Sequence, residues 1–92
     1  MANGIVGRGF AAVDCVAMDT CIAVGEQVDT SDDLTTLIEE WNGARWAVVS
    51  SPSPGLNRNE LLDVSCARLA TCVAVGAMDT ARSIDTMILS NR

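Results

Sequence analysis

Four cysteines have the most distinctive spacing in this sequence. Cys15 and Cys21 are separated by five residues, and so are Cys66 and Cys72. Four thiols allow three pairings, and the repeated spacing favours Cys15–Cys21 and Cys66–Cys72, each across a turn. Such pairs predict an oxidising, secreted or extracytoplasmic location. The alternatives are four reduced, buried thiols, or a zinc site, which the unusual spacing and the lack of histidine disfavour.

The sequence lacks one of the residue types that nucleophilic catalysis commonly uses. The chain has no histidine, which excludes the common Ser-His-Asp and Cys-His arrangements. The carboxylate pairs Asp32/Asp33 and Glu39/Glu40 could do acid–base chemistry. Residues 29–33 are more typical of a solvated loop, with weak calcium binding as the sharper alternative. We therefore expect no enzyme, no catalytic residue, no cofactor and no metal.

Two tryptophans indicate a binding surface. Trp41 and Trp46 enclose a short segment that contains Asn42 and Arg45, and Glu40 precedes it. In a lectin-like site, a Trp ring stacks on a sugar while neighbouring polar groups exchange hydrogen bonds with its hydroxyls. These five residues are the candidate ligand-binding set. The alternative is that both rings pack between structural units.

The charge restricts the possible partners. The formal net charge is −6, and an acidic surface argues against nucleic-acid binding. No apolar run approaches the roughly 18 residues of a membrane span, and the first residues do not resemble a signal peptide. We expect neither a nucleic-acid nor a membrane partner. A chain of 92 residues is one domain, and one this short usually needs disulfides, a metal or partner subunits.

An internal repeat organises the chain. Residues 13–15 align with 64–66, and Cys21-Ile-Ala-Val-Gly aligns with Cys72-Val-Ala-Val-Gly, both at an offset of 51. After one deletion the offset becomes 50, and residues 34–38 align with 84–88.

Each unit is predicted to contain short strands. Residues 10–15 and 61–66 precede five-residue turns, and the apolar runs 21–25 and 72–76 end at glycine, as buried strands often do. A third strand is predicted over 34–41.

Turn signals follow the third strand. Asn42-Gly43 predicts a hairpin into a fourth strand over 46–50, and Pro52 and Pro54 mark the exit. A helix over 32–40, opened by Ser31, is the alternative, which the Asn-Gly pair and the β-branched residues disfavour.

Four antiparallel strands in about 50 residues is the size of one propeller blade. We predict an all-β fold in which residues 1–92 form a single unit of two four-stranded β-propeller blades. Repeat one covers about 10–60, and repeat two covers about 61–92 and is completed by an N-terminal strand, 1–9. Two blades leave edges and apolar faces open, so we expect a homo-oligomer closed into a ring. A trimer with six blades is favoured, and a fragment of a longer repeat protein is the alternative.

Four motifs, taken from the two repeats together, form a recognisable pattern: Leu-x-x-Val-Ser-Cys at 61–66, Cys-x-Ala-Val-Gly at 72–76, Thr-Leu-Ile-Glu-x-Trp-Asn-Gly-x-x-Trp at 36–46 and Ser-Pro-x-Pro at 51–54. The pattern resembles the repeats of bacterial, often secreted, propeller-type proteins, and its layout is similar to Asp-box and photosystem-assembly-factor propellers. The resemblance covers nearly the whole chain and implies a binding or scaffolding role. In two respects the chain departs from it: the second unit lacks the Trp-Asn-Gly-x-x-Trp segment, and the chain is shorter than a full ring.

These features predict a non-enzymatic, oligomeric propeller with lectin-like, multivalent recognition of a glycan or another small-molecule ligand. Weak sites repeated around a ring gain affinity through avidity. The alternatives are a structural or protein-assembly scaffold, a ring that sequesters a small metabolite or nucleotide, and an engineered chain made to study how propellers assemble from blades.

Overall fold

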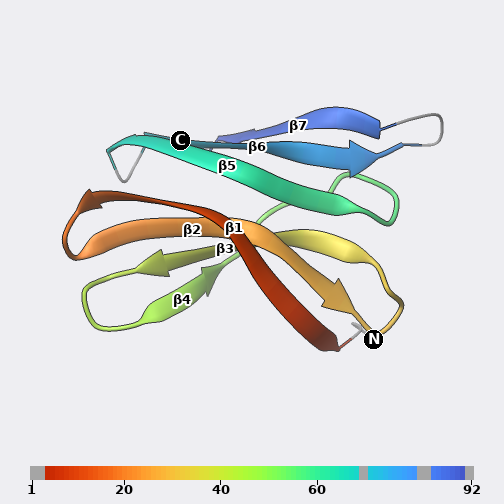
Figure 1. The fold of residues 1–92 in the computed structure, drawn as a ribbon, viewed down its shortest axis with the longest axis horizontal. Helices are drawn as coiled ribbons and strands as arrows, with labels where there is room; N and C mark the ends of the chain where they lie inside the picture. Colours follow the sequence, from red (N-terminus) through yellow and green to blue (C-terminus); the bar gives the residue numbers. More distant parts are fainter. Residues whose placement is uncertain (1–3, 69–70, 81–83, 91–92) are drawn as a thin grey trace.

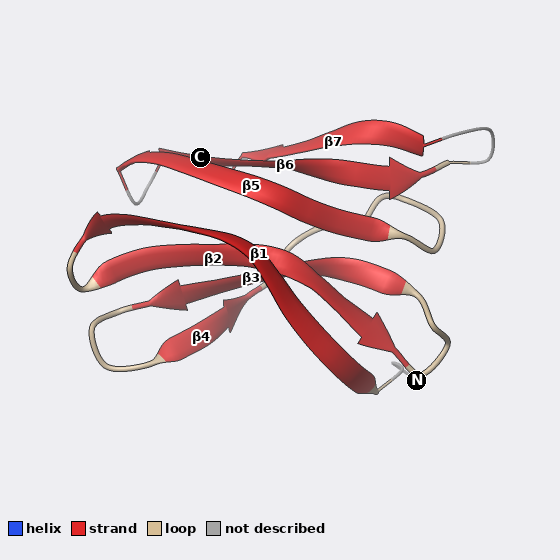
Figure 2. Cartoon of the chain, viewed as in Figure 1, coloured by secondary structure: helices blue, strands red, loops and turns tan. Residues whose placement is uncertain are grey.

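The computed structural model describes residues 4–68, 71–80 and 84–90, and this part of the chain is all-β with no helix. It forms two antiparallel sheets, one of four strands in the order β1-β2-β3-β4 and one of three in the order β5-β6-β7 (Figures 1 and 2). The strands are β1 Ile5–Ala17, β2 Thr20–Asp29, β3 Leu34–Trp41, β4 Trp46–Val49, β5 Asn59–Arg68, β6 Thr71–Asp79 and β7 Ile84–Ser90. The all-β prediction is confirmed, and the single chain closes no ring.

The hairpin after β3 forms as its turn residues predict. Gly43 has a φ of 95°, a left-handed conformation that glycine adopts without strain. The side-chain oxygen of Asn42 accepts hydrogen bonds from the backbone N–H groups of Ala44 and Arg45, at 2.9 and 3.1 Å. The segment from Leu34 to Trp41 is therefore a strand that leads into a tight turn, as predicted, and not the alternative helix.

The prediction that β2 and β6 end at Gly25 and Gly76 is wrong. Both strands continue beyond these glycines, to Asp29 and Asp79. Phe10 pairs with Gly25 and Ala12 with Val24, so Ala11 is an extra residue that forms a β-bulge.

The bulge explains why these positions are glycine. It brings the backbone of β1 so close that a Cβ atom at Gly25 would overlap the carbonyl oxygen of Gly9. The second sheet repeats this arrangement, where a Cβ at Gly76 would overlap the carbonyl oxygen of Glu60. These glycines allow close backbone approach and do not end a strand.

The repeat is thus visible in the structure as well as in the sequence. A second irregularity lies between Cys15 and Ala17 and recurs between Cys66 and Arg68, at the same offset as the first.

Both predicted disulfides are formed, Cys15–Cys21 and Cys66–Cys72. Because each closes a shorter loop than 15 residues, each contributes less than about 3 kcal/mol through chain entropy. Two bonded pairs are compatible with an oxidising, extracytoplasmic location. In the described part of the chain, no helix has the length and apolar character to span a membrane.

Successive side chains of a strand point to opposite faces of its sheet, so each sheet has two faces. We call the front face the one that carries Phe10, Val13, Cys21 and Ala23 in the first sheet, and the repeat-equivalent Leu61, Val64, Cys72 and Ala74 in the second. The back face carries Ile22, Val24 and Ile38 in the first sheet, and the equivalent Val73, Val75 and Ile88 in the second.

The core lies where the back face of the first sheet meets the front face of the second. Its buried members are Ile22, Val24, Leu61, Val64, Cys72 and Ala74. Burial of this apolar surface at about 25 cal/mol per Å² is the main force that holds the two sheets together.

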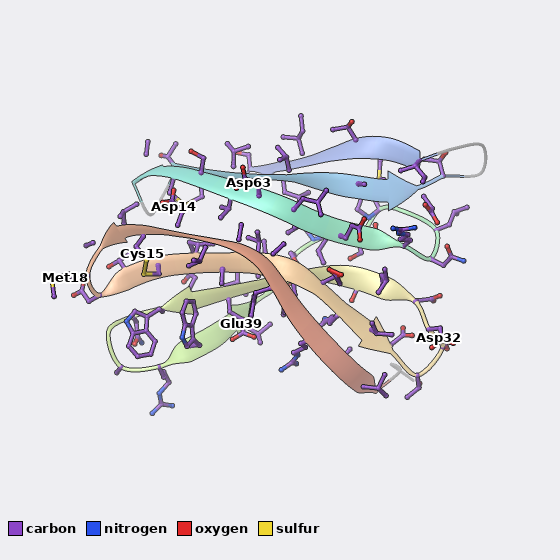
Figure 3. The ribbon with its side chains drawn as sticks, viewed as in Figure 1. Asp14, Cys15, Met18, Asp32, Glu39 and Asp63 are labelled. Carbon is purple, nitrogen blue, oxygen red and sulfur yellow. A yellow bond between two sulfur atoms is a disulfide. The ribbon has the colours of Figure 1, made fainter. Side chains whose placement is uncertain are left out.

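Hydrogen bonds fix how the sheets pack. Asp14 reaches between them, where a carboxylate oxygen accepts the backbone N–H of Cys66 at 2.7 Å (Figure 3). Asn59 is buried, donates to the carbonyl oxygen of Leu34 at 3.1 Å and accepts from the N–H of Gly55. A buried side chain on the second sheet with partners on the first sheet and in the linker specifies one arrangement, because shifting it would leave polar groups unsatisfied.

The linker between the sheets is also bonded to β3. The hydroxyl of Thr36 donates to the carbonyl oxygen of Pro52 at 2.9 Å, and the N–H of Thr36 donates to the hydroxyl of Ser53 at 2.9 Å. These contacts hold the Ser-Pro segment against the first sheet, where it leads from β4 to β5.

Residues 5–9 form the beginning of β1. Residues 1–3 are outside the described part, but Arg8 pairs with Gln27 as Asn59 pairs with Met78, at the offset of 51. The expected boundary between an N-terminal strand, 1–9, and repeat one falls inside β1. Residues 5–8 are paired with β2 in the single chain. They would have to break this pairing to complete the second repeat of a neighbouring copy, so this strand exchange stays a prediction.

Candidate functional site

The β3–β4 hairpin brings the two tryptophans together. Trp41 and Trp46 pair directly across the strands, with ring centroids 5.7 Å apart and planes tilted by 44°. Trp46 is exposed and Trp41 is half-buried. Because cross-strand partners share a face, both rings lie on the front face of the first sheet, in the row of Cys21. They do not belong to the core between the sheets.

The other predicted site residues are divided between the turn and the opposite face. The oxygen of Asn42 is engaged by the turn, and Arg45 is exposed beside it. Glu40 pairs with Ile22 and Ala47, which places it on the back face. It therefore faces away from the tryptophan pair.

Glu39 is the carboxylate that shares the front face with the tryptophans. It pairs with Ala23 on β2 and with Val48 on β4, and it is half-buried (Figure 3). Sequence reasoning chose Glu40 for its closeness to Trp41 in the chain. The alternation of a strand is the signal that would have pointed to Glu39, since residues i and i+2 share a face. The same alternation puts Glu39 and Glu40 on opposite faces, so they do not act on one group.

The front face of the first sheet is an exposed apolar surface. Its exposed members are Phe10, Val13, Trp46 and Val48. Exposed apolar side chains gathered on one face of a sheet indicate a binding or assembly surface.

A partly open, mostly apolar pocket of about 120 Å³ lies between the sheets, near β4 and β7. From the first sheet Ile22, Val24, Ile38, Glu40 and Val49 line it; from the second, Val64, Cys72, Ala74 and Leu89 do so. Sequence reasoning did not predict this pocket, because it depends on how two sheets pack.

The acidic segment after β2 forms a turn. The Asp29 side chain is buried, and one oxygen accepts the N–H groups of Ser31 and Asp33 at 2.8 and 3.0 Å. Asp32 has a φ of 63°. The carboxylate of Asp29 thus organises residues 30–33, which form the predicted loop. The prediction that Asp29 is itself part of a solvated loop is wrong, because it is the buried last residue of β2. Within residues 4–68, 71–80 and 84–90, no three potential ligand residues are grouped to hold a metal ion.

The geometry therefore offers two candidate sites, the tryptophan pair and the pocket between the sheets. Comparisons with protein-family models, with curated proteins and with solved structures find no match to this chain.

Proposed function

We propose that this chain is a non-enzymatic building block of a homo-oligomeric propeller that binds glycans or other small ligands at its Trp41–Trp46 pair. The observation that carries the proposal is a difference between repeat-equivalent residues. Four of the six residues that are buried where the two sheets meet, Ile22, Val24, Leu61 and Val64, have counterparts that are exposed at the two outer faces of the chain.

On the front faces, Leu61 is 0% exposed and its equivalent Phe10 is 54% exposed. Val64 is 8% exposed, and its equivalent Val13 is 59% exposed. The front face of the first sheet thus has the residue types of an interface without a sheet packed on it.

On the back faces the order is reversed. Val24 is 0% exposed and its equivalent Val75 is 38% exposed. The back face of the second sheet and the front face of the first therefore have the residue types of the two sides of the interface within the chain. A second copy that stacks one on the other repeats the interface already present within the chain.

Such stacking is a head-to-tail interface, which closes into a ring if its rotation allows. Propellers commonly have four to eight blades, so three copies with six blades fit the range. The two disulfides support a secreted or extracytoplasmic place for this assembly.

The tryptophan pair would lie at the border between neighbouring copies. Trp46 is in β4, the outermost strand of its sheet, and is 43% exposed. It would therefore lie at the rim of the assembly, where a ligand can reach it. A sugar ring could stack there, with Glu39 on the same face of the sheet and Arg45 next to Trp46 in the chain as polar partners. Repetition around the ring would raise the avidity of weak sites.

The ligand is tested on a glycan array and by quenching of tryptophan fluorescence with the sugars that the array retains. Trp46→Ala is expected to weaken binding at least tenfold, because stacking area is lost, while the mass of the particle stays unchanged. Leu56→Ala, at an exposed position in the loop before β5, is the control and should bind normally. No retention on the array, or normal binding by Trp46→Ala, would contradict the proposed site.

A scaffold role is the second candidate, and the exposed front face favours it. Phe10, Val13 and Val48 are exposed apolar side chains on one face of the sheet, and such a face fits a protein better than a sugar. A stoichiometric protein partner released by Val13→Glu, together with an empty glycan array, would support this function over the first.

A further inference from the structure

The outer edge of β7 is the feature that neither the tryptophan pair nor the stacking faces use. Strand β7 corresponds to β3 in the repeat, at an offset of 50. β3 lies between β2 and β4, whereas β7 pairs with β6 alone among the described strands. An edge strand presents backbone N–H and C=O groups that can pair with another chain.

We propose that this edge and the adjoining pocket bind an extended segment of another polypeptide, one with the alternating apolar pattern of β4. Strand β4 shows what fits, because it covers the equivalent edge in the first sheet. There Val49 pairs with Ile38, Val48 with Glu39 and Ala47 with Glu40. The same register places three residues of the bound segment opposite Ile88, Leu89 and Ser90.

The register also determines which side chain of the segment enters the pocket. The residue opposite Leu89 takes the place of Val48 and lies on the front face, toward the first sheet. There the pocket is bordered by Ile38 and Val49. Its volume of about 120 Å³ is well above the roughly 10–15 Å³ that a cavity needs to hold one water molecule. It therefore suits a branched aliphatic side chain, and burial of that side chain contributes to the affinity.

Backbone pairing supplies the rest of the affinity, as in other cases of strand addition. The segment should be neutral or basic. The chain has a net charge of −6, and the pocket contains the carboxylate of Glu40. An acidic segment would be repelled.

A second copy of this chain is a poorer occupant than a different polypeptide. Its β4 is already paired with β3, and its residues 5–8 are paired with β2. Either segment would have to break an existing ladder before it could bind. A segment that is extended and unpaired beforehand loses only its own conformational entropy when it binds.

The probe is a synthetic peptide with the sequence of residues 44–54, which contains β4 and the Ser-Pro exit. We expect it to bind the purified full chain in isothermal titration calorimetry and to slow hydrogen exchange of the Ile88–Ser90 amides. A peptide with Val48→Asp should bind at least tenfold more weakly, because it would place a charge in an apolar pocket.

A protein variant completes the test. Ser50 is exposed and lines the pocket, so Ser50→Trp should fill the pocket and weaken peptide binding at least tenfold. Leu56→Trp adds the same ring in an exposed loop and should leave binding unchanged. Circular dichroism checks that both variants are folded.

Three results would overturn the inference: absence of protection at β7, equal binding to Ser50→Trp and Leu56→Trp, or self-association of the chain that Ser50→Trp abolishes. The last would identify a second copy as the occupant. None of these three results depends on the proposed ring, because the copies in the ring stack through Val13 and Val75 on the outer faces of the sheets, and the segment binds at the edge of β7.

Discussion

Gly76→Ala is expected to cost about 3 kcal/mol or more of the free energy of unfolding. The added Cβ would overlap the carbonyl oxygen of Glu60, and Leu61 Cα lies 2.8 Å from the same position. Both are backbone atoms inside the bulge, so no side-chain rotation relieves the overlap and β5 must separate from β6. A domain of this size has a total stability of only about 5–15 kcal/mol, so the loss is a large part of the whole.

Urea unfolding followed by circular dichroism measures this effect. Gly9→Ala is the matched control, because a Cβ there meets no atom within 4 Å. It should change the free energy of unfolding by about 0.5 kcal/mol or less. Equal unfolding midpoints for the two variants would mean that β5 does not cross Gly76 in this way.

Leu61→Ala is expected to lower the free energy of unfolding by about 2–5 kcal/mol. Leu61 is fully buried and belongs to the cluster that joins the two sheets. Truncation removes apolar contacts to both sheets and leaves a cavity between them. The loss should also raise the rate of hydrogen exchange in both sheets, since they would separate more often.

Leu62 is the control for this prediction. It is the next residue along β5, it is the extra residue of the bulge, and it is exposed. Leu62→Ala should change stability by about 0.5 kcal/mol or less. If the two substitutions cost the same in chemical denaturation, the sheets do not pack through Leu61.

The parts of the fold that depend on local chemistry were predictable from the sequence. The disulfide pairs and the Asn42-Gly43 turn follow from neighbouring residues, the repeat follows from a comparison of the two halves of the sequence, and the structure contains all three. The ends of β2 and β6 were not predictable in this way. Glycine often ends a strand, but Gly25 and Gly76 are needed because a bulge in the adjacent strand brings its backbone close to them. The sequence of one strand does not reveal a bulge in another.

The candidate site shows the same limit. Proximity in the chain pointed to Glu40, whereas strand alternation places Glu39 beside the tryptophans. The pocket and the two outer faces arise from packing between the two sheets, so they became visible only in three dimensions. The exposure of Phe10 and Val75, compared with their buried equivalents, is likewise a property of the folded chain.

The account depends on the outer faces of the two sheets stacking on further copies of the chain. The most direct test is the mass of the particle in solution, measured by light scattering across a range of concentrations. We expect a discrete oligomer, with three chains favoured, that Val75→Glu reduces to single chains while Leu56→Glu does not. A single-chain mass for the unaltered protein at every concentration would contradict the account.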